Sequence, residues 1–396
     1  MFLTYQENII NNICYNIPYE NTTNRGGTGG HFYPLIAVSQ ALRKEVKKQK
    51  YIEPEIHFIS DSPYNESILF DNRIVFHKVP AGKIRLYFSP LNIIDWFKTG
   101  IGSLKALIIL FKLYPDVIFS KGGYSAFPTL LAAKILKIPV VIHESDTVPG
   151  KVNRWSGKFA KKIAVSYPEA IKYFDEEKTA WTGNPVRDEI ATPAGDGAHE
   201  FLDLEKDLPA ILILGGSQGA QFINDSILIA LPDLLKNYQI VHQVGPKNED
   251  DVLKEVDVVL EDPELIQYKK RYKVFGTLND LATKMSAGVA DLIITRAGSS
   301  LFEIARWGIP SIIVPISNSN GDHQRTNAYT FSRATEAVVI EEQNMNSSIL
   351  ISEINRILDS KETKERMSTK AKEFAKVDAA EKISKVILQI ASKHEK

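Results

Sequence analysis

The chain has 396 residues, 44% of them hydrophobic and 24% charged, with 48 basic and 48 acidic side chains. This composition excludes disordered and fibrous proteins and predicts two globular domains, because one domain usually holds about 100 to 200 residues. The single cysteine, Cys14, excludes an internal disulfide. No charged start followed by an apolar core is visible at the N-terminus, so we expect a cytoplasmic protein.

The charges are unevenly distributed along the chain. Residues 1–190 carry 24 basic and 18 acidic side chains, so this half has a net charge of +6 and the remainder −6. Within 73–121 the apolar side chains Trp96 and Phe97 stand among eight basic residues, Arg73, Lys78, Lys83, Arg85, Lys98, Lys105, Lys112 and Lys121. Its longest apolar run is far below the ~18 residues that span a bilayer. The segment therefore predicts a surface that enters lipid headgroups without crossing the membrane.

From residue 34 onward, short apolar runs alternate with helical periodicity. The predicted strands of the first half are 55–60, 116–120, 139–144 and 162–166, and its predicted helices include 34–48 and 127–136. The predicted strands of the second half are 210–216, 239–245, 291–298 and 311–315. A Pro- and Gly-rich stretch, 191–199, is predicted to link the halves. This pattern predicts an α/β fold with two doubly wound parallel sheets.

Four glycine-rich loops stand before predicted helices, at 26–31, 121–125, 215–220 and 296–300. Glycine lets backbone N–H groups approach a phosphate, and a helix N-terminus adds partial positive charge. The first loop is a poor dinucleotide fingerprint, because Phe32 occupies the third glycine position. Four such loops, in two domains facing one cleft, favour two phosphate-bearing ligands.

Seven motifs follow one another from Gly26 to the last helices: GGTGGHFYP, KGGYSAFP, HESD with PG, TGNPVR, GGSQGAQFIN, RAGSSLFE and DHQRTNA. In this order they resemble the MurG-type glycosyltransferases. The resemblance implies a GT-B fold, with two Rossmann-like domains facing a central cleft. It places an acceptor domain at 1–185 and a UDP-sugar domain at 186–378, with a C-terminal helix at about 379–396 packing back on the first domain.

The resemblance also implies an activity and partners. The activity is inverting transfer of N-acetylglucosamine from UDP-N-acetylglucosamine to the C4 hydroxyl of an undecaprenyl-diphosphate-linked N-acetylmuramoyl peptide, in peptidoglycan synthesis. The expected location is the cytoplasmic face of the cell membrane, on its anionic inner leaflet, and no nucleic-acid partner is expected. Three alternatives stay open: a glycosyltransferase with another lipid acceptor, a UDP-sugar epimerase and a non-catalytic membrane scaffold. The basic apolar segment counts against an epimerase, which needs no membrane surface.

Two residues are candidates for the base that accepts the acceptor's hydroxyl proton. His31 is the first, because an imidazole titrates near neutrality and follows an open glycine loop. Asp146 is the second, at a position where the family more often has asparagine. A helix-capping or phosphate-binding role for His31 is an equal alternative. His143 and Glu144 are expected to orient the acceptor.

The remaining site residues follow from the motifs and the resemblance. Candidates for the acceptor and its diphosphate are Thr28, Gly29, Gly30, Lys121, Gly122, Gly123 and Tyr124. Candidates for the donor are Arg187, Ser217, Gln218, Gly219, Leu278, Ser299, Glu303, His323 and Gln324. The interval from Arg296 to Glu303 looks one residue shorter than the family pattern, which would turn Glu303 by a helical step of ~100°. Asn327 is expected to support the loop of the sugar and uracil contacts, which include Gln324 and Leu278, and Arg296 to form a structural ion pair.

Two further features concern what the sequence lacks. No Asp-x-Asp motif follows a predicted strand and the eight histidines have no ligand spacing, so we expect no metal or other cofactor. The polar NTTNR stands where the family has an apolar strand leading into the first glycine loop. Either residues 8–17 form that strand ahead of a long loop, or the strand is lost and His31 is misplaced.

Overall fold

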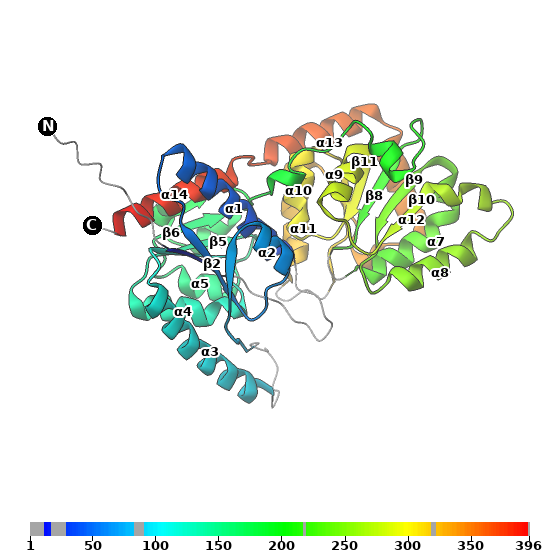
Figure 1. Ribbon diagram of the computed structural model, residues 1–396. Coiled ribbons are helices and arrows are strands. Elements are labelled where there is room, and N and C mark those ends of the chain that lie inside the picture. Colours follow the sequence, from blue (N-terminus) through cyan, green and yellow to red (C-terminus); the bar gives the residue numbers. More distant parts are fainter. Residues whose placement is uncertain (1–11, 17–28, 83–90, 217–218, 318–321, 395–396) are drawn as a thin grey trace. The chain divides into compact units, whose positions relative to one another are not determined.

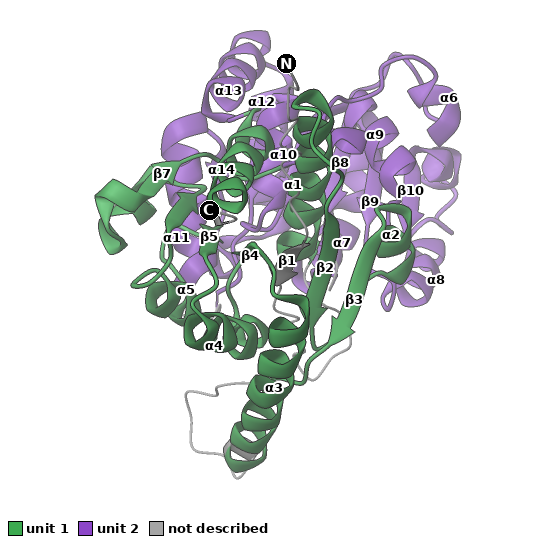
Figure 2. Ribbon diagram, turned by 60° about the vertical axis from the view of Figure 1, so that its left-hand side comes forward, with its two compact units in different colours: residues 1–185, 377–396 green, residues 186–376 purple. Residues whose placement is uncertain are grey.

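The structure is a computed structural model that describes residues 12–16, 29–82, 91–216, 219–317 and 322–394 (Figure 1). The chain divides into two compact units, which Figure 2 shows in different colours. Unit 1 comprises Met1–Pro185 and Val377–Lys396, and unit 2 comprises Val186–Lys376. Each unit has its own parallel sheet with helices on both faces, so the predicted α/β fold class is confirmed.

Unit 1 is built on a seven-stranded sheet with the order β3-β2-β1-β4-β5-β6-β7. Its strands are β1 (Asn12–Asn16), β2 (Glu55–Ser60), β3 (Ile74–Lys78), β4 (Val117–Ser120), β5 (Val140–Glu144), β6 (Lys162–Val165) and β7 (Thr179–Trp181). All neighbouring pairs are parallel. The strand order reverses between β1 and β4, and ligands of such sheets bind at the carboxyl ends of the strands beside this reversal.

The first strand of unit 1, for which the sequence left two alternatives, is present. Residues Asn12–Asn16 form β1, which pairs with β2 on one side and with β4 on the other. This confirms the alternative in which residues within 8–17 supply the strand, and the alternative of a lost strand is wrong. β1 has parallel neighbours on both sides, so it lies in the interior of the sheet.

Helices cover both faces of the unit 1 sheet. One face carries α1 (Gly29–Lys48), α2 (Glu66–Asp71) and α14 (Ala379–His394), which share an apolar core with β1's neighbours. The other face carries α3 (Leu91–Leu113), α4 (Phe127–Leu136) and α5 (Lys151–Ser156). Helix α14 therefore returns the chain to unit 1, where Ile383, Ile387 and Leu388 are buried. Among the described helices, none is long and apolar enough to cross a membrane.

Unit 2 repeats this architecture with a six-stranded sheet in the order β10-β9-β8-β11-β12-β13. Its strands are β8 (Ala210–Leu214), β9 (Gln239–Gln243), β10 (Tyr272–Phe275), β11 (Ala290–Thr295), β12 (Ser311–Ile313) and β13 (Val338–Val339). Its main helices are α7 (Gln221–Asn237), α8 (Glu249–Val259), α9 (Asp280–Val289), α10 (Ser300–Trp307), α11 (His323–Thr335), α12 (Ser347–Leu358) and α13 (Lys361–Phe374). Here the order reverses between β8 and β11.

The Pro- and Gly-rich stretch 191–199 is not a linker between the units, which corrects the sequence prediction. The division falls between Pro185 and Val186, and the stretch itself packs on unit 2. Arg306 Nε donates to Ala191 O at 3.2 Å, and Ala194 N donates to Lys284 O at 3.1 Å. Composition predicted a loose segment because Pro and Gly disfavour regular structure, but one side-chain and one backbone hydrogen bond hold it to unit 2.

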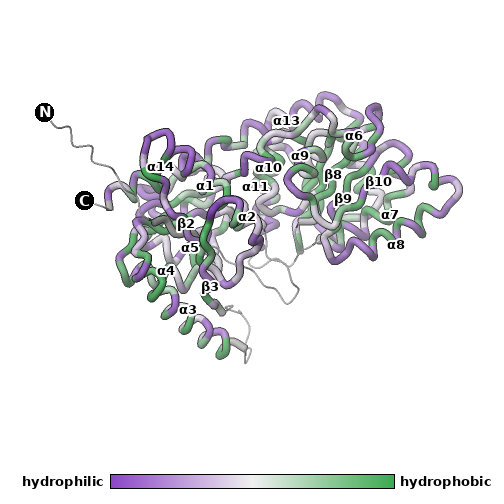
Figure 3. Tube along the Cα trace, in the orientation of Figure 1, coloured by the Kyte–Doolittle hydropathy of each residue, from purple (hydrophilic) through white to green (hydrophobic). Residues whose placement is uncertain are grey.

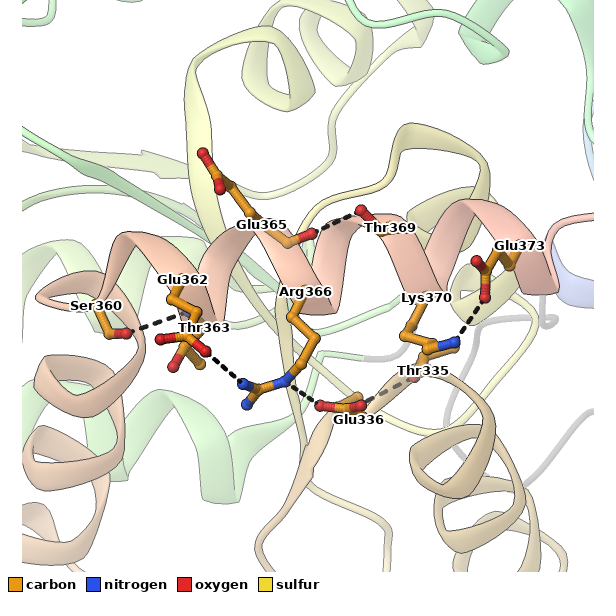
Figure 4. Close-up of polar contacts among 11 residues, drawn as sticks. Thr335, Glu336, Ser360, Glu362, Thr363, Glu365, Arg366, Thr369, Lys370 and Glu373 are labelled. Atoms are coloured by element: carbon orange, nitrogen blue, oxygen red, sulfur yellow. Dashed lines mark hydrogen bonds and ion pairs between the residues drawn. The ribbon is translucent and has the colours of Figure 1, made fainter.

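Helix α13 is held to unit 2 mainly by burial of its apolar side. Met367 and Ala371 are buried, and polar side chains elsewhere on the helix make the contacts in Figure 4. There Ser360 Oγ caps the helix by accepting from Thr363 N at 3.1 Å, and Arg366 pairs with Glu336 at the end of α11. Exposed ion pairs of this kind contribute about 0 to 1 kcal/mol each, so the buried side chains carry most of the docking energy.

Candidate active site

His31, the first candidate base, lies in unit 1 near the reversal of strand order between β1 and β4. Helix α1 begins at Gly29, five residues earlier than predicted, so Gly30 and His31 belong to its first turn. Pro34 concealed this start from the sequence, because a proline inside a helix removes one backbone hydrogen bond. Lys121, Gly122 and Gly123 follow β4, the neighbour of β1. Thr28 lies outside the described residues.

Two glycines here leave no room for a side chain. A Cβ at Gly29 would lie 2.7 Å from the Tyr33 ring and 2.9 Å from the Tyr64 hydroxyl. Gly122 has φ +79°, and its Cβ would lie 2.3 Å from Asn153 Oδ1. Gly123 also has φ +79°. These positions require glycine for backbone conformation and for close packing.

We expect Gly122→Ala to lower the free energy of unfolding by about 2 kcal/mol or more, because a left-handed alanine costs about 1 to 2 kcal/mol before the clash with Asn153 is counted. Urea unfolding measures this change. Gly100→Ala is the matched control, because that glycine lies in exposed helix α3 with nothing within 4 Å of its Cβ. Equal stability of the two variants would show that the 120s loop tolerates a side chain.

Lys121 is buried, and its side chain lies inside unit 1. It is 1% exposed, and its Nζ lies 2.8 Å from His143 Nδ1 and 3.1 Å from Asn184 Oδ1. His143 comes from the end of β5, and its Nε2 lies 3.0 Å from Gly183 O. Asn184 lies in the TGNPVR motif and had no predicted role, although that motif marked its position.

Glu144 organises the loop that carries Asp146. Its carboxylate accepts hydrogen bonds from Asp146 N at 2.9 Å, Gly150 N at 3.1 Å and Asn153 Nδ2 at 2.9 Å. Burial, and next the nearby Asp146 charge, raise the pKa of Glu144, and the hydrogen bonds oppose this shift. Asn153, which the sequence analysis missed, also donates to His143 O at 3.2 Å. These contacts tie the end of β5 to α5.

The two candidate bases interact electrostatically. Burial, and next the Lys121 charge, lower the pKa of His31 to about 4, although the Asp146 carboxylate opposes them. His31 is half-buried, and its Nδ1 has no hydrogen-bond partner among the described residues. A buried ring nitrogen without a partner can accept or donate a proton to a bound molecule.

A carboxylate that the sequence analysis missed lies beside Tyr124. Asp61 follows β2, and its Oδ2 accepts from the Tyr124 hydroxyl at 3.4 Å. Burial raises the pKa of Asp61, and hydrogen bonds from Ser60 and Tyr124 oppose the shift. Asp61 had no glycine or family motif beside it, so the sequence offered no signal except its position after a strand.

In unit 2 the predicted donor loops lie at the second reversal of strand order. Gly215–Gly219 follows β8, and the Ala297–Ser299 loop follows β11 before α10. Gly219 has φ +70°, and a Cβ there would lie 2.3 Å from Asn248 Nδ2. Ser299 is the residue that precedes α10. Ser217 and Gln218 lie outside the described residues.

Arg187, Asp280 and Glu303 form a charged group in unit 2. Arg187 is 6% exposed, and its guanidinium pairs with Asp280 Oδ1 at 2.6 Å. Glu303 lies in the first turns of α10, where burial raises its pKa to about 7; Arg187 opposes and Asp280 adds to this shift. Leu278 is half-buried in the loop before α9. The Arg187 charge acts on the pKa of Glu303, so these two predicted donor ligands lie near each other in unit 2.

In unit 2 the predicted structural ion pair of Arg296 is confirmed, and Asn327 supports the loop before α10. Arg296 pairs with Glu342 at 2.7 Å and donates to Val314 O at 3.0 Å, so it is a structural cation. Asn327 Nδ2 donates to Ala297 O at 3.3 Å and so fastens α11 to the loop before α10. His323 and Gln324 begin α11, and Gln324 Oε1 accepts from Ile316 N at 3.2 Å. The described residues contain no cluster of metal-ligating side chains.

Comparison with known proteins decides the family. Residues 24–165 match the glycosyltransferase family 28 N-terminal domain, and residues 210–383 match its C-terminal domain. A Clostridium botulinum protein is 36% identical over 367 residues, which are 92% of this chain and 96% of that protein. The chain belongs to glycosyltransferase family 28. That family 28 relative is named UDP-N-acetylglucosamine–N-acetylmuramyl-(pentapeptide) pyrophosphoryl-undecaprenol N-acetylglucosamine transferase.

Other comparisons agree with this family 28 assignment. A Bacillus cereus protein with the same transferase name, number 2, is 35% identical and covers 85% of this chain and 91% of its own length. The crystal structure of Acinetobacter baumannii MurG superposes with a TM-score of 0.69 at 24% identity, covering 96% of this chain and 99% of that one. A UDP-GlcNAc 2-epimerase from Neisseria meningitidis has a TM-score of 0.64 at 14% identity, covering 96% and 100%. These structures show the shared GT-B fold and no more.

Proposed function

We propose that this family 28 enzyme transfers N-acetylglucosamine from UDP-N-acetylglucosamine, with inversion, to the C4 hydroxyl of undecaprenyl-diphosphate-linked N-acetylmuramoyl peptide. The observation that carries the proposal is the transferase name shared by relatives that are 33–36% identical over most of this chain. The seven motifs and the residues gathered at both reversals of strand order support it. The step belongs to peptidoglycan synthesis.

In the proposed reaction, unit 1 binds the acceptor. A sugar hydroxyl attacks the anomeric carbon as its proton passes to His31 or Asp146, and the bond to UDP breaks. Given its pKa of about 4, the His31 ring is neutral above about pH 5 and can accept a proton, although it is a weaker base than an ordinary histidine. The first glycine loop and Gly122–Gly123 are proposed to approach the lipid diphosphate, with Tyr124 and Glu144 beside them.

Unit 2 is proposed to bind the donor. The loop after β8 with the start of α7 holds the UDP diphosphate, as helix N-termini favour anions. Glu303 accepts the two ribose hydroxyls, Gln324 and His323 contact the sugar, and Arg187 with the backbone near Leu278 contacts uracil. Departing charge on UDP is met by these N–H groups and not by a metal ion.

Glu303→Ala combined with Gln324→Ala is expected to weaken UDP-N-acetylglucosamine binding by about 5- to 150-fold, because each substitution removes hydrogen bonds that contribute about 0.5 to 1.5 kcal/mol. Binding should also weaken as the pH falls below about 7, since burial raises the pKa of Glu303 to about 7 and a protonated carboxyl accepts less well. Calorimetry across pH 5.5–8.5 measures both effects. Unchanged affinity in the double variant would remove both residues from the donor site.

Transfer of labelled N-acetylglucosamine to a lipid-diphosphate muramoyl acceptor, with and without EDTA, tests the whole proposal. The expected result is labelled glycolipid at equal rates under both conditions. Transfer only to a different lipid acceptor would select the related glycosyltransferase. Conversion of UDP-N-acetylglucosamine to its 2-epimer would select the epimerase, and binding without turnover of any acceptor would select the scaffold.

The enzyme is also proposed to act at the cytoplasmic face of the membrane, through helix α3. This helix has two apolar sides: Ala106 and Leu110 are buried, whereas Phe97, Ile101 and Phe111 are 63 to 70% exposed. In Figures 1 and 2 its N-terminal part extends beyond the rest of unit 1, and Figure 3 shows hydrophobic turns along it. An exposed apolar row of this kind marks an interaction surface. Lys83, Arg85, Leu86 and Phe88 of the predicted segment lie outside the described residues.

A further inference from the structure

Glu342 joins two loops of unit 2, and no step of the proposed reaction uses it. It lies in the short 3-10 helix Glu342–Asn344 that follows β13. Its Oε1 pairs with the Arg296 guanidinium at 2.7 Å, and its Oε2 accepts from Ser317 N at 2.9 Å and from Ser317 Oγ at 2.7 Å. Arg296 begins the loop between β11 and α10, whereas Ser317 lies in the segment between β12 and α11. One carboxylate therefore holds both loops.

The ion pair between Glu342 and Arg296 is shielded from water. The two side chains are 17% and 12% exposed, and Arg296 also donates to Val314 O at 3.0 Å. Burial favours the neutral form of Glu342, but hydrogen bonds from Ser317 and the Arg296 charge outweigh burial and lower the pKa of this carboxyl. Glu342 is therefore ionised near neutral pH, and its charge-assisted hydrogen bonds are stronger than bonds between neutral groups.

Ile316 connects this carboxylate with the start of α11. Ile316 N donates to Gln324 Oε1 at 3.2 Å. Ile316 and Ser317 are consecutive and a planar peptide bond joins them, so fixing Ser317 at Glu342 restricts where Ile316 N can lie. A chain of contacts thus runs from Glu342 through Ser317 and Ile316 to the Gln324 side chain.

We propose that Glu342 is a positioning residue of the donor site, which fixes the Gln324 amide through Ser317 and Ile316 without contacting the donor itself. The inference rests on the proposed function, in which Gln324 contacts the sugar of the donor. A glutamine side chain that is not held samples several rotamers, and holding it before the donor arrives reduces the entropy lost on binding. No motif of the sequence includes Glu342, so the sequence analysis gave it no role.

A double-mutant cycle on UDP-N-acetylglucosamine affinity, measured by calorimetry, tests the proposal. Glu342→Ala alone is expected to weaken binding by about 3- to 10-fold, which corresponds to the loss of about one hydrogen bond. In the Gln324→Ala background the same change should have little further effect, because the side chain that Glu342 positions is gone. A carboxylate that only stabilises the fold would instead give the same fold-change in both backgrounds.

Amide exchange of Ile316, followed by NMR in substrate-free protein, tests the chain of contacts itself. Glu342→Ala should speed this exchange by about 10-fold or more, because Ser317 is no longer held and the bond from Ile316 N to Gln324 opens more often. Glu353→Gln is the matched control, because it removes a carboxylate that pairs with Arg356 at 2.6 Å on α12. It should change neither the exchange of Ile316 nor donor affinity.

Thermal unfolding establishes that each variant is folded. If the alanine variant does not fold, Glu342→Gln replaces it, since one amide oxygen cannot accept from Arg296 and Ser317 together. An unchanged Ile316 exchange rate, or equal fold-changes in the two backgrounds, would overturn the proposal. An unaltered protein that binds no donor would refute the proposed function and the donor role of Glu342 with it, whereas the exchange rates would still report on the chain of contacts.

Discussion

His31→Ala is expected to lower kcat by about 10²-fold or more while donor affinity stays nearly unchanged, because general-base catalysis contributes on that scale and the donor residues belong to unit 2. In the unaltered enzyme, kcat/KM should fall as the pH is lowered toward about 4. The sign follows from the lowered pKa of His31: the ring is neutral, and able to accept a proton, above about 4 and protonated below it.

Asp146→Asn separates the two candidate bases. If His31 is the base, this variant loses only the carboxylate that raises the pKa of His31, so turnover falls modestly. If Asp146 is the base, turnover is abolished, and His31→Ala mainly raises the acceptor KM. Steady-state kinetics with both substrates varied distinguishes these outcomes. Full turnover in both variants would reject both residues and leave the first glycine loop as a phosphate-binding element.

The sequence predicted most of the central sheet of each unit, because fully buried parallel strands are continuous apolar runs. Residues 55–60, 139–144 and 210–216 lie within or just beyond observed strands. The peripheral strands β3, β7, β10 and β13 were missed. β7 and β13 have only three and two residues, and β3 carries His77 and Lys78, so none shows a clear apolar pattern.

The sequence predicted the site residues that a glycine motif marks. It did not predict the contacts between site residues, which depend on the tertiary structure. Glycine loops revealed His31, Gly122 and Gly219, since a positive φ or a close approach leaves glycine in the sequence. No periodicity or motif spacing could show that Lys121 turns inward to His143, because both lie at the carboxyl ends of strands and could equally face a ligand. Side-chain direction at the end of a strand depends on the neighbouring strand, which the tertiary structure supplies.

Replacement of four exposed apolar residues of α3 by glutamine is expected to release the protein from anionic vesicles. The residues are Phe97, Ile101, Leu104 and Phe111, which are 62 to 70% exposed and recur every three to seven positions on one side of the helix. If each loses about 1 kcal/mol of partial burial in the bilayer, affinity falls by about 10³-fold. Glutamine is a good helix former, so α3 itself should persist. Vesicle co-sedimentation at low salt measures the loss.

The lysines Lys98, Lys105 and Lys112 recur every seven residues beside this apolar row, so they are expected to supply the salt-dependent part of binding, about 1 kcal/mol each. Their replacement by glutamine should weaken vesicle binding at low salt and leave little salt dependence.

The matched control for the apolar α3 variant is Phe70→Gln with Ile229→Gln, which removes two side chains that are 82% and 71% exposed on other helices. Retained binding by the α3 variant, or equal loss by the control, would show that α3 is not the membrane surface. UDP-N-acetylglucosamine affinity should be the same in all variants, because unit 2 carries the proposed donor site.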